Sequence, residues 1–277
     1  TAFSSKGVST VAGGNGYGSG FNQLSNPSHV ALDSSGNIYV SDYLNSRVMK
    51  WAPYASQGTV VAGGNGQGSE LNQLRYNTSL ALDSSGNMYV ADSNNNRIMK
   101  WAPGASEGTV VAGGNGGGSE TNQFAAPNGI TLDSSGNMYI ADQSNHRIMK
   151  WAPDGLEGTV VAGGNGQGSA TNQFSYPLDI ALDSSGNMYI ADRNNHRIMK
   201  WAPDATVGTV VVDGNGGSLL TYPRGVALDS SVNIYVADTQ NHRVMKWEPG
   251  ATEGSVVAGG NGSGSALNQL SNPYGVA

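Results

Sequence analysis

The sequence predicts an all-β β-propeller made of four-stranded antiparallel blades. A segment reading ALDSSGNMYVADSNNNRIMKW at 81–101 has close copies through almost the whole chain, and each copy ends on a tryptophan: Trp51, Trp101, Trp151, Trp201 and Trp247. The period is about fifty residues, with a last step shorter by about four, and repeats of this length are typical of propellers and solenoids. Each repeat also divides into short apolar segments separated by turn residues, as propeller blades do.

Four strands are expected in one repeat, at 80–82, 88–91, 97–101 and 108–112. Asp83 to Asn87 is a turn, because Gly and Asn there accept a left-handed backbone. A polar loop at 93–96 follows the second strand, and the third strand alternates apolar and polar residues. Gly-Gly-Asn-Gly at 113–116 ends the fourth strand. One blade cannot bury both of its faces, so neighbouring blades must stack around an axis.

A single domain at 1–277 is expected, with five complete blades at about 30–62, 80–112, 130–162, 180–212 and 226–258. A further fourth strand at 8–12 and a further first strand at 275–277 leave a terminal partial blade that lacks its two middle strands. Three explanations stay open. The sequence is cut from a longer array whose ring has six blades, which we favour; another chain supplies the missing strands; or five blades close the ring alone.

Composition excludes some classes of function. Charged residues are 12% of the 277 and the formal net charge is −6, so no overall basic field gathers nucleic acid or an anionic membrane. The chain has no cysteine for a disulfide or a thiolate metal site, and no apolar run of the roughly 18 residues that span a membrane. Asn77 and Asn261 begin glycosylation sequons, and we expect a secreted, extracellular glycoprotein.

One repeat resembles a known family. The run Ile-Ala-Asp-Gln-Ser-Asn-His-Arg-Ile at 140–148, preceded by Pro127 to Ile130 and by Asp133, is similar to the NHL repeat, whose members are usually six-bladed propellers. The resemblance covers nearly the whole chain, because the same strand order recurs in register five times. The Gly-Gly-Asn-Gly and Asn-Gln-Leu/Phe segments make this repeat longer than the common NHL unit.

Most of the repeated polar residues are interpreted as scaffold. An aspartate stands five positions before an arginine in every repeat: Asp42 and Arg47, Asp92 and Arg97, Asp142 and Arg147, Asp192 and Arg197, Asp238 and Arg243. Across a four-residue hairpin loop this spacing lets carboxylate and guanidinium pair. A metal-ligand role is less favoured, since a residue needed in every blade serves every blade. A second set of aspartates fits turn initiation: Asp33, Asp83, Asp133, Asp183 and Asp229.

Metal and phosphate sites are considered and not favoured. His146, His196 and His242 share one repeat position and suggest zinc, which peptidyl-amidoglycolate lyases bind on a related six-bladed propeller. Copies in three blades would lie too far apart to share one ion. The glycine-rich runs at 13–16 and 63–66 open no helix, so they are interpreted as turns rather than phosphate loops. No cofactor and no metal are expected.

Functional residues are expected where the blades differ. The loops before the first strand and after the second strand end on the same face of a propeller, where these folds usually bind ligands. Neutral drift on a solvated rim is the alternative. The ligand-face candidates are Ser28, His29, Tyr43, Ser93, Asn128, Gln143, Asp179, Arg193, Arg224 and Thr239.

The sequence is compatible with three functions. We expect a non-catalytic binding or scaffold propeller that holds a protein or glycan partner on its loop face. The first alternative is a structural subunit of a larger array or filament, with self-assembly through the incomplete terminal blade. The second is a lyase or lactonase-like enzyme with His29 and Asp179 as its acid/base pair. Nucleic-acid and membrane partners are not expected.

Overall fold

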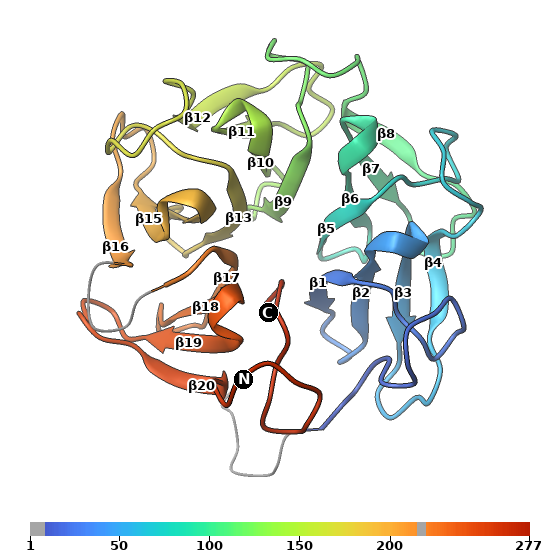
Figure 1. Ribbon diagram of the computed structural model, residues 1–277. Coiled ribbons are helices and arrows are strands. Elements are labelled where there is room, and N and C mark those ends of the chain that lie inside the picture. The colour runs from blue at the N-terminus through green and yellow to red at the C-terminus, as the bar shows by residue number, and fades with distance from the viewer. Residues whose placement is uncertain (1–8, 215–219) are drawn as a thin grey trace.

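The computed structural model describes residues 9–214 and 220–277, and it is a β-propeller (Figure 1). Within these residues, twenty strands form five antiparallel sheets of four strands, and each sheet keeps the order of the chain. The predicted all-β propeller is confirmed, and five complete blades agree with the five-bladed alternative. None of the helices in the described part of the chain is long and apolar enough to cross a membrane.

The first three blades have closely matching bounds. Blade 1 consists of β1 (Pro27–Leu32), β2 (Ile38–Asp42), β3 (Arg47–Trp51) and β4 (Thr59–Gly63). Blade 2 consists of β5 (Asn77–Leu82), β6 (Met88–Asp92), β7 (Arg97–Trp101) and β8 (Thr109–Gly113). Blade 3 consists of β9 (Pro127–Leu132), β10 (Met138–Asp142), β11 (Arg147–Trp151) and β12 (Thr159–Gly163).

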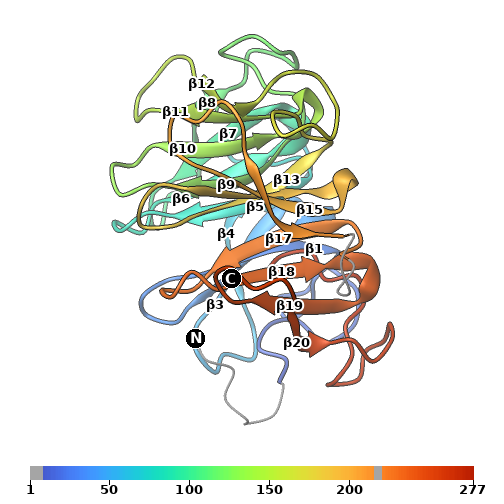
Figure 2. The same cartoon turned by 90° about the vertical axis from the view of Figure 1, so that its left-hand side faces the viewer.

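The last two blades repeat the pattern. Blade 4 consists of β13 (Pro177–Leu182), β14 (Met188–Asp192), β15 (Arg197–Trp201) and β16 (Thr209–Asp213). Blade 5 consists of β17 (Pro223–Leu228), β18 (Ile234–Asp238), β19 (Arg243–Trp247) and β20 (Ser255–Gly259). A short 3-10 turn joins the second and third strands of each blade: η1 (Tyr43–Asn45), η2 (Ser93–Asn95), η3 (Gln143–Asn145), η4 (Arg193–Asn195) and η5 (Thr239–Asn241). Figure 2 shows the ring from the side.

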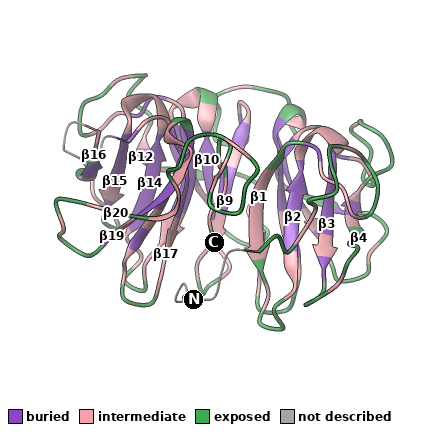
Figure 3. Ribbon diagram, turned by 60° about the horizontal axis from the view of Figure 1, so that its bottom comes forward, coloured by how far each residue is buried: buried purple, intermediate pink, exposed green. Residues whose placement is uncertain are grey.

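Alternating side chains place the core between blades. In blade 3, Tyr139 and Ile148 face blade 4, where they pack in one buried cluster with Met199 and Trp201. The neighbouring residues Met138, Ile140, Met149 and Trp151 of the same strands face blade 2. Figure 3 shows that burial concentrates on the strands and exposure on the loops. A blade is therefore buried against the blades beside it rather than by a core of its own.

A buried ion pair fixes the hairpin of each blade. In blade 3, Arg147 Nε donates to Asp142 Oδ2 at 2.7 Å, and this carboxylate also accepts the N–H of Ala125 and an amide N–H of Asn145, both at 2.8 Å. The expected pairing is confirmed in all five blades. Because Ala125 belongs to the segment that arrives from blade 2, the aspartate also anchors the crossing between blades.

The guanidinium extends this anchoring. The two Nη atoms of Arg147 donate to three carbonyl oxygens of the same crossing segment, those of Ser119, Glu120 and Gln123, at 2.6, 3.0 and 3.1 Å. Arg47, Arg97 and Arg197 make the matching contacts in blades 1, 2 and 4. The long glycine-rich linker is thus an acceptor loop for the next arginine, which explains why linker and pair recur together.

The innermost layer of the ring has a sixth member besides the five first strands. A Cβ built on Gly129 would lie 2.6 Å from both Leu178 O and Asp179 Cα of the next blade. A Cβ on Gly225 would lie 2.6 Å from Tyr274 O and 3.0 Å from Gly275 Cα, and one on Gly275 would lie 3.0 Å from His29 Cα. The C-terminal segment therefore stands between blade 5 and blade 1 in the place of a first strand.

The partial blade expected from residues 8–12 and 275–277 forms no ladder. Val8 lies outside the described residues, and residues 9–12 and 275–277 are not strands. Within the described chain, no pair of strands stands between these two segments to hydrogen-bond with them. Ala12 and Leu24 nevertheless pack on Met49 and Trp51 of blade 1, as Ala62 and Leu74 pack on blade 2.

We predict that Asp142→Asn destabilises the fold by about 3 kcal/mol or more, because it leaves the buried guanidinium of Arg147 without its carboxylate. Urea unfolding followed by tryptophan fluorescence measures the change. Asp154→Asn is the matched control, since Asp154 is exposed on the loop after β11. Equal stability of the two variants would contradict the role given to the pair.

Candidate ligand site at the mouth of the ring

A cavity of about 360 Å³, which we call the mouth, opens at one end of the ring. The first strands begin there, and the 3-10 turns lie there. The two sets of loops meet there because first and second strands are antiparallel, so that Pro27 at the start of β1 pairs with Asp42 at the end of β2. Nine of the ten ligand-face candidates line this cavity: Ser28, His29, Tyr43, Ser93, Asn128, Gln143, Asp179, Arg193 and Arg224. Thr239 lines an adjoining cavity.

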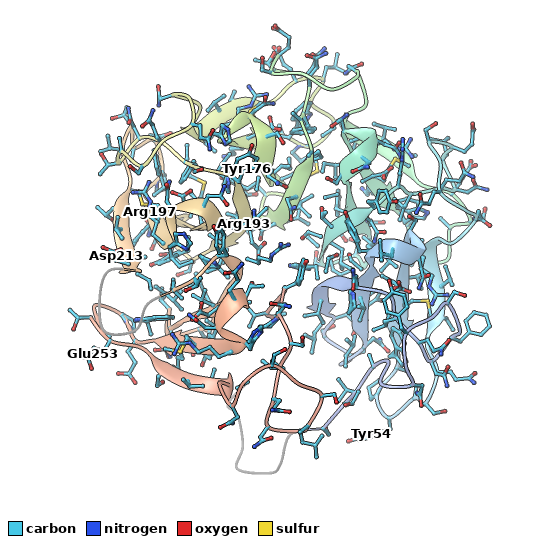
Figure 4. All side chains as sticks on the ribbon, in the orientation of Figure 1. Tyr54, Tyr176, Arg193, Arg197, Asp213 and Glu253 are labelled. Carbon is cyan, nitrogen blue, oxygen red and sulfur yellow. The ribbon has the colours of Figure 1, made fainter. Side chains whose placement is uncertain are left out.

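Two arginines carry the positive charge of the site. The guanidinium carbon of Arg224 lies 3.9 Å from the ring centre of Tyr274, and that of Arg193 lies 5.1 Å from the ring centre of Tyr222. Neither guanidinium forms an ion pair with a carboxylate in the described residues, and both Nε atoms are buried without a hydrogen-bond partner there. Figure 4 places Arg193 near the centre of the ring, while Glu253, Asp213 and Tyr54 lie at its periphery.

The proximity of the two arginines has an electrostatic consequence. Burial, and after it the positive charge of nearby Arg193, lowers the pKa of Arg224, although the phenol of Tyr274 opposes the shift. Arginine remains charged at any physiological pH. The mouth therefore holds two positive charges that form no ion pair with a carboxylate of the described residues, and an anion placed there would gain two charge-assisted donors.

His29 and Asp179 meet across the same cavity. His29 Nε2 lies 4.0 Å from Asp179 Oδ1, and Asp179 Oδ2 accepts the N–H of Val226 at 3.0 Å. Burial raises the pKa of Asp179 to about 7, against the opposing hydrogen bonds from the backbone of Val226 and Ile180, and burial lowers the pKa of His29 to about 4. At neutral pH the imidazole is uncharged and the carboxyl group is about half protonated, so the pair carries only part of one negative charge.

The remaining candidates are held by neutral hydrogen bonds. The amide of Asn128 donates to Gln143 Oε1 at 3.0 Å, which links β9 to η3. Ser28 Oγ donates to Thr78 O of the next blade at 2.7 Å. The ring of Tyr43 lies 5.1 Å from that of Tyr76. These residues of the cavity are polar and uncharged.

The repeated histidines have a structural partner. The Nδ1 atoms of His146, His196 and His242 accept backbone N–H groups of Tyr176, Tyr222 and Asn272, at 3.2, 3.1 and 3.1 Å. Ser46 and Asn96 accept the equivalent N–H groups in the other two blades. Each histidine therefore ties its loop to the next repeat. No group of three or more potential metal ligands occurs among residues 9–214 and 220–277.

The two sequons differ in exposure. Asn77 is fully buried in β5, and its amide donates to Arg47 O at 3.1 Å, so a glycan on Asn77 would have to displace the blade interface. Asn261 is exposed, and its amide donates to Asn268 O within the last linker at 2.9 Å. Their use as glycosylation sites stays a prediction.

Tyr274 is a cavity residue that the sequence reasoning missed. It lines the mouth beside Arg224, although it belongs to the C-terminal segment rather than to a complete blade. The sequence does indicate this position, because Pro273-Tyr274-Gly275 aligns with Pro223-Arg224-Gly225 of the preceding repeat. A sixth copy of the variable position therefore faces the axis.

Comparison with known proteins gives the same fold. The family model for the NHL repeat matches residues 174–201 and 220–247. A chain of a nidogen/laminin complex is 19% identical over 90% of this chain and 83% of its own length, with a TM-score of 0.67. No curated protein matches the sequence.

Two solved enzymes are similar as well. A gluconolactonase from Xanthomonas campestris is 12% identical over 85% of this chain and 77% of its own, with a TM-score of 0.64. A streptogramin B lyase is 14% identical over 86% and 71%, with a TM-score of 0.56. At these identities the likeness shows the fold alone.

We predict that Asp179→Asn gains stability relative to the unchanged chain as the pH rises from about 4 to about 7. The carboxyl group keeps its proton to about pH 7 in the folded chain but loses it near its ordinary pKa of 3.8 when unfolded. The contribution of Asp179 to the stability of the unchanged chain therefore falls over this range, by a few kcal/mol at most, and the variant avoids that loss.

Urea unfolding of both proteins at a series of pH values measures the difference. His29 titrates in the opposite sense, because its lowered pKa makes stability rise between about pH 4 and 6.5. Both proteins contain His29, so the comparison isolates Asp179. A stability difference that does not change with pH would show that Asp179 is ionised normally.

Proposed function

We propose that this chain, an NHL-repeat β-propeller, is a binding module that holds a protein or glycan partner at the mouth of its ring. One observation carries the proposal. The residues that differ from blade to blade gather around one cavity, and two of them are arginines without a carboxylate partner in the described chain. The contacts that build the scaffold recur from blade to blade, whereas the residues around the cavity differ between blades.

The chemistry of the mouth favours an acidic group on the partner. A guanidinium offers a planar fork of donors that matches a carboxylate, sulfate or phosphate, and burial of the Nε atoms strengthens such bonds. The uncharged amides of Asn128 and Gln143 in the same cavity suit hydroxyl or peptide groups next to that anion. An acidic sugar and an acidic peptide both carry this combination.

Protein binding has a parallel among the similar folds. The nidogen/laminin chain, whose name records a complex between two proteins, is similar over 90% of this chain. That likeness supports the proposal that a propeller of this shape binds another protein. The residues of the mouth support the proposal that the partner is acidic. An extracellular location and a structural role in a larger array stay predictions.

Catalysis is a second candidate, and the pairing of His29 with Asp179 favours it. The side chains come from β1 and β13, far apart in sequence, yet lie 4.0 Å apart inside the cavity. An acid and a base at this spacing could transfer a proton, and similar folds include a lyase and a gluconolactonase. The two arginines carry more charge than this pair, and they make ligand binding the better supported function.

We predict that Arg193→Gln and Arg224→Gln each weaken binding of an acidic probe about tenfold, because each removes a charge-assisted donor. The probes are a fluorescent tetraglutamate peptide and a fluorescent tetragalacturonate, measured by anisotropy at low salt. Arg75→Gln is the matched control, since Arg75 is an exposed arginine of the linker before β5 and does not line the cavity.

Equal losses in all three variants would mean that binding follows overall charge rather than the mouth. Absence of saturable binding by the unchanged chain would contradict an acidic partner.

The enzymatic alternative makes a separate prediction. If His29 and Asp179 transfer protons, hydrolysis of gluconolactone above the uncatalysed rate should be seen and should fall at least about a hundredfold in His29→Gln. Arg193→Gln would then change KM more than kcat. No rate above background would leave the binding function as the account of the site.

A further inference from the structure

The gap between blade 5 and blade 1 has two apolar walls that face each other without the strands that cover such walls elsewhere. We call this place the sixth-blade gap. Its inner side is the C-terminal segment 271–277, and its outer side is the N-terminal segment 9–24, which packs on blade 1 through Ala12 and Leu24. Figure 1 shows the C-terminal segment between β17 and β1.

The wall on blade 5 is less buried than its counterparts. Val244 of β19 is 8% exposed, whereas Ile98, Ile148 and Ile198 at the same repeat position are 0% exposed. The next two members of the wall, Ala258 and Leu270, are only partly buried, although their counterparts in the other blades are buried. Among the described residues, this wall belongs to no apolar cluster, while its equivalents each join one.

The wall on blade 1 shows the same deficit from the other side. Val40 is 6% exposed, against 0% for its equivalents in the other four blades, and Ile38 is partly buried where its equivalents are buried. Leu32 is exposed. The cluster on this wall holds Val40, Met49 and Trp51 but receives no tyrosine or isoleucine from a neighbouring second or third strand.

The four complete interfaces show what covers such walls. The hairpin of β10 and β11 presents Met138, Ile140, Met149 and Trp151 to blade 2 and, on its other face, Tyr139, Ala141 and Ile148 to blade 4. A hairpin of this sequence in the sixth-blade gap would present the first set to blade 5 and the second set to blade 1. Both walls would then be buried as in the complete interfaces.

Polar contacts for the same hairpin are also in place. The last linker keeps the fold of the other acceptor loops, with the N–H of Gly264 donating to Leu270 O at 3.3 Å and that of Gln269 donating to Ala266 O at 2.9 Å. In blade 3 the acceptors of Arg147 are Ser119, Glu120 and Gln123, whose counterparts in the last linker are Ser265, Ala266 and Gln269. An incoming arginine therefore has a formed loop to bind.

We propose that the sixth-blade gap is a docking site for a two-stranded β-hairpin that carries the second and third strands of this repeat, with its Asp and Arg five residues apart. Such a hairpin would pair at its inner edge with residues 275–277 and at its outer edge with residues 9–12. This is β-strand addition with side-chain specificity, because alternate residues meet two different apolar walls. The site adjoins the mouth, because the C-terminal segment forms its inner side and also carries Tyr274, but its ligand is a hairpin rather than an acidic group.

The test uses a labelled peptide with the sequence of residues 134–151, SSGNMYIADQSNHRIMKW, added to the unchanged chain. We expect saturable binding of one peptide per chain by fluorescence anisotropy and a rise in the unfolding temperature. A peptide with Arg147→Gln and Asp142→Asn should bind at least about tenfold more weakly, because it lacks the charge-assisted contacts to the acceptor loop.

Variants of the chain locate the site. Leu32→Asp should weaken peptide binding about tenfold, since it places a charge on the apolar wall of blade 1. Val207→Asp is the matched control, because Leu32 is 52% and Val207 is 53% exposed and Val207 lies in the loop between β15 and β16. Leu270→Asp tests the opposite wall, and circular dichroism confirms that each variant folds.

Three results would overturn the proposal. They are no saturable binding of the peptide, equal weakening by Leu32→Asp and Val207→Asp, and a stable dimer in analytical ultracentrifugation that the peptide does not dissociate. The last result would show that a second copy of the chain covers the walls. Because none of the readouts uses an acidic probe, failure here would leave the proposed function of the mouth untouched.

Discussion

The buried pair of aspartate and arginine is the interaction on which the rest of the ring depends. One carboxylate accepts hydrogen bonds from its own hairpin and from the crossing segment, and the guanidinium beside it binds three further carbonyl groups of that segment. Charges this deeply buried are tolerated only when their hydrogen bonds are satisfied, and removing one member typically costs about 3–5 kcal/mol. The same few atoms thus fix a hairpin turn, the linker and the contact between two blades.

The need to keep the buried pair in every blade distinguishes the residues that hold the ring together from the residues of the candidate ligand site. Positions that serve the pair, the Asp33-type turns and the interblade clusters cannot vary without disturbing a contact that recurs around the ring. Residues at the mouth face the axis instead, so Arg193 and Arg224 can stand where the other blades have uncharged residues ranging from serine to tyrosine and leucine. A closely repeated frame with a varied mouth is the arrangement expected of a binding propeller, and the sixth-blade gap follows from the same repetition.

Much of this could be predicted from the sequence, because the determinants are local and periodic. The spacing of Asp142 and Arg147 predicted their pairing, and the antiparallel order of the strands predicted that His29 and Asp179 would share one face. The reach of Arg147 to Ser119 could not be predicted, since it depends on the path of a linker whose residues carry no distinctive side chain. The stacking of Arg224 on Tyr274 was missed because it requires the C-terminal segment to take the place of a sixth first strand.

The most direct test of the central pair is the exchange of the arginine Nε–H protons with solvent, followed by NMR on the intact chain. The account predicts that Arg47, Arg97, Arg147 and Arg197 show Nε–H signals that exchange far more slowly than that of exposed Arg75, because each is buried and donates to a carboxylate at 2.7 Å. Exchange as fast as that of Arg75 would show that the pairs are open in solution and would contradict their role in holding the blades together.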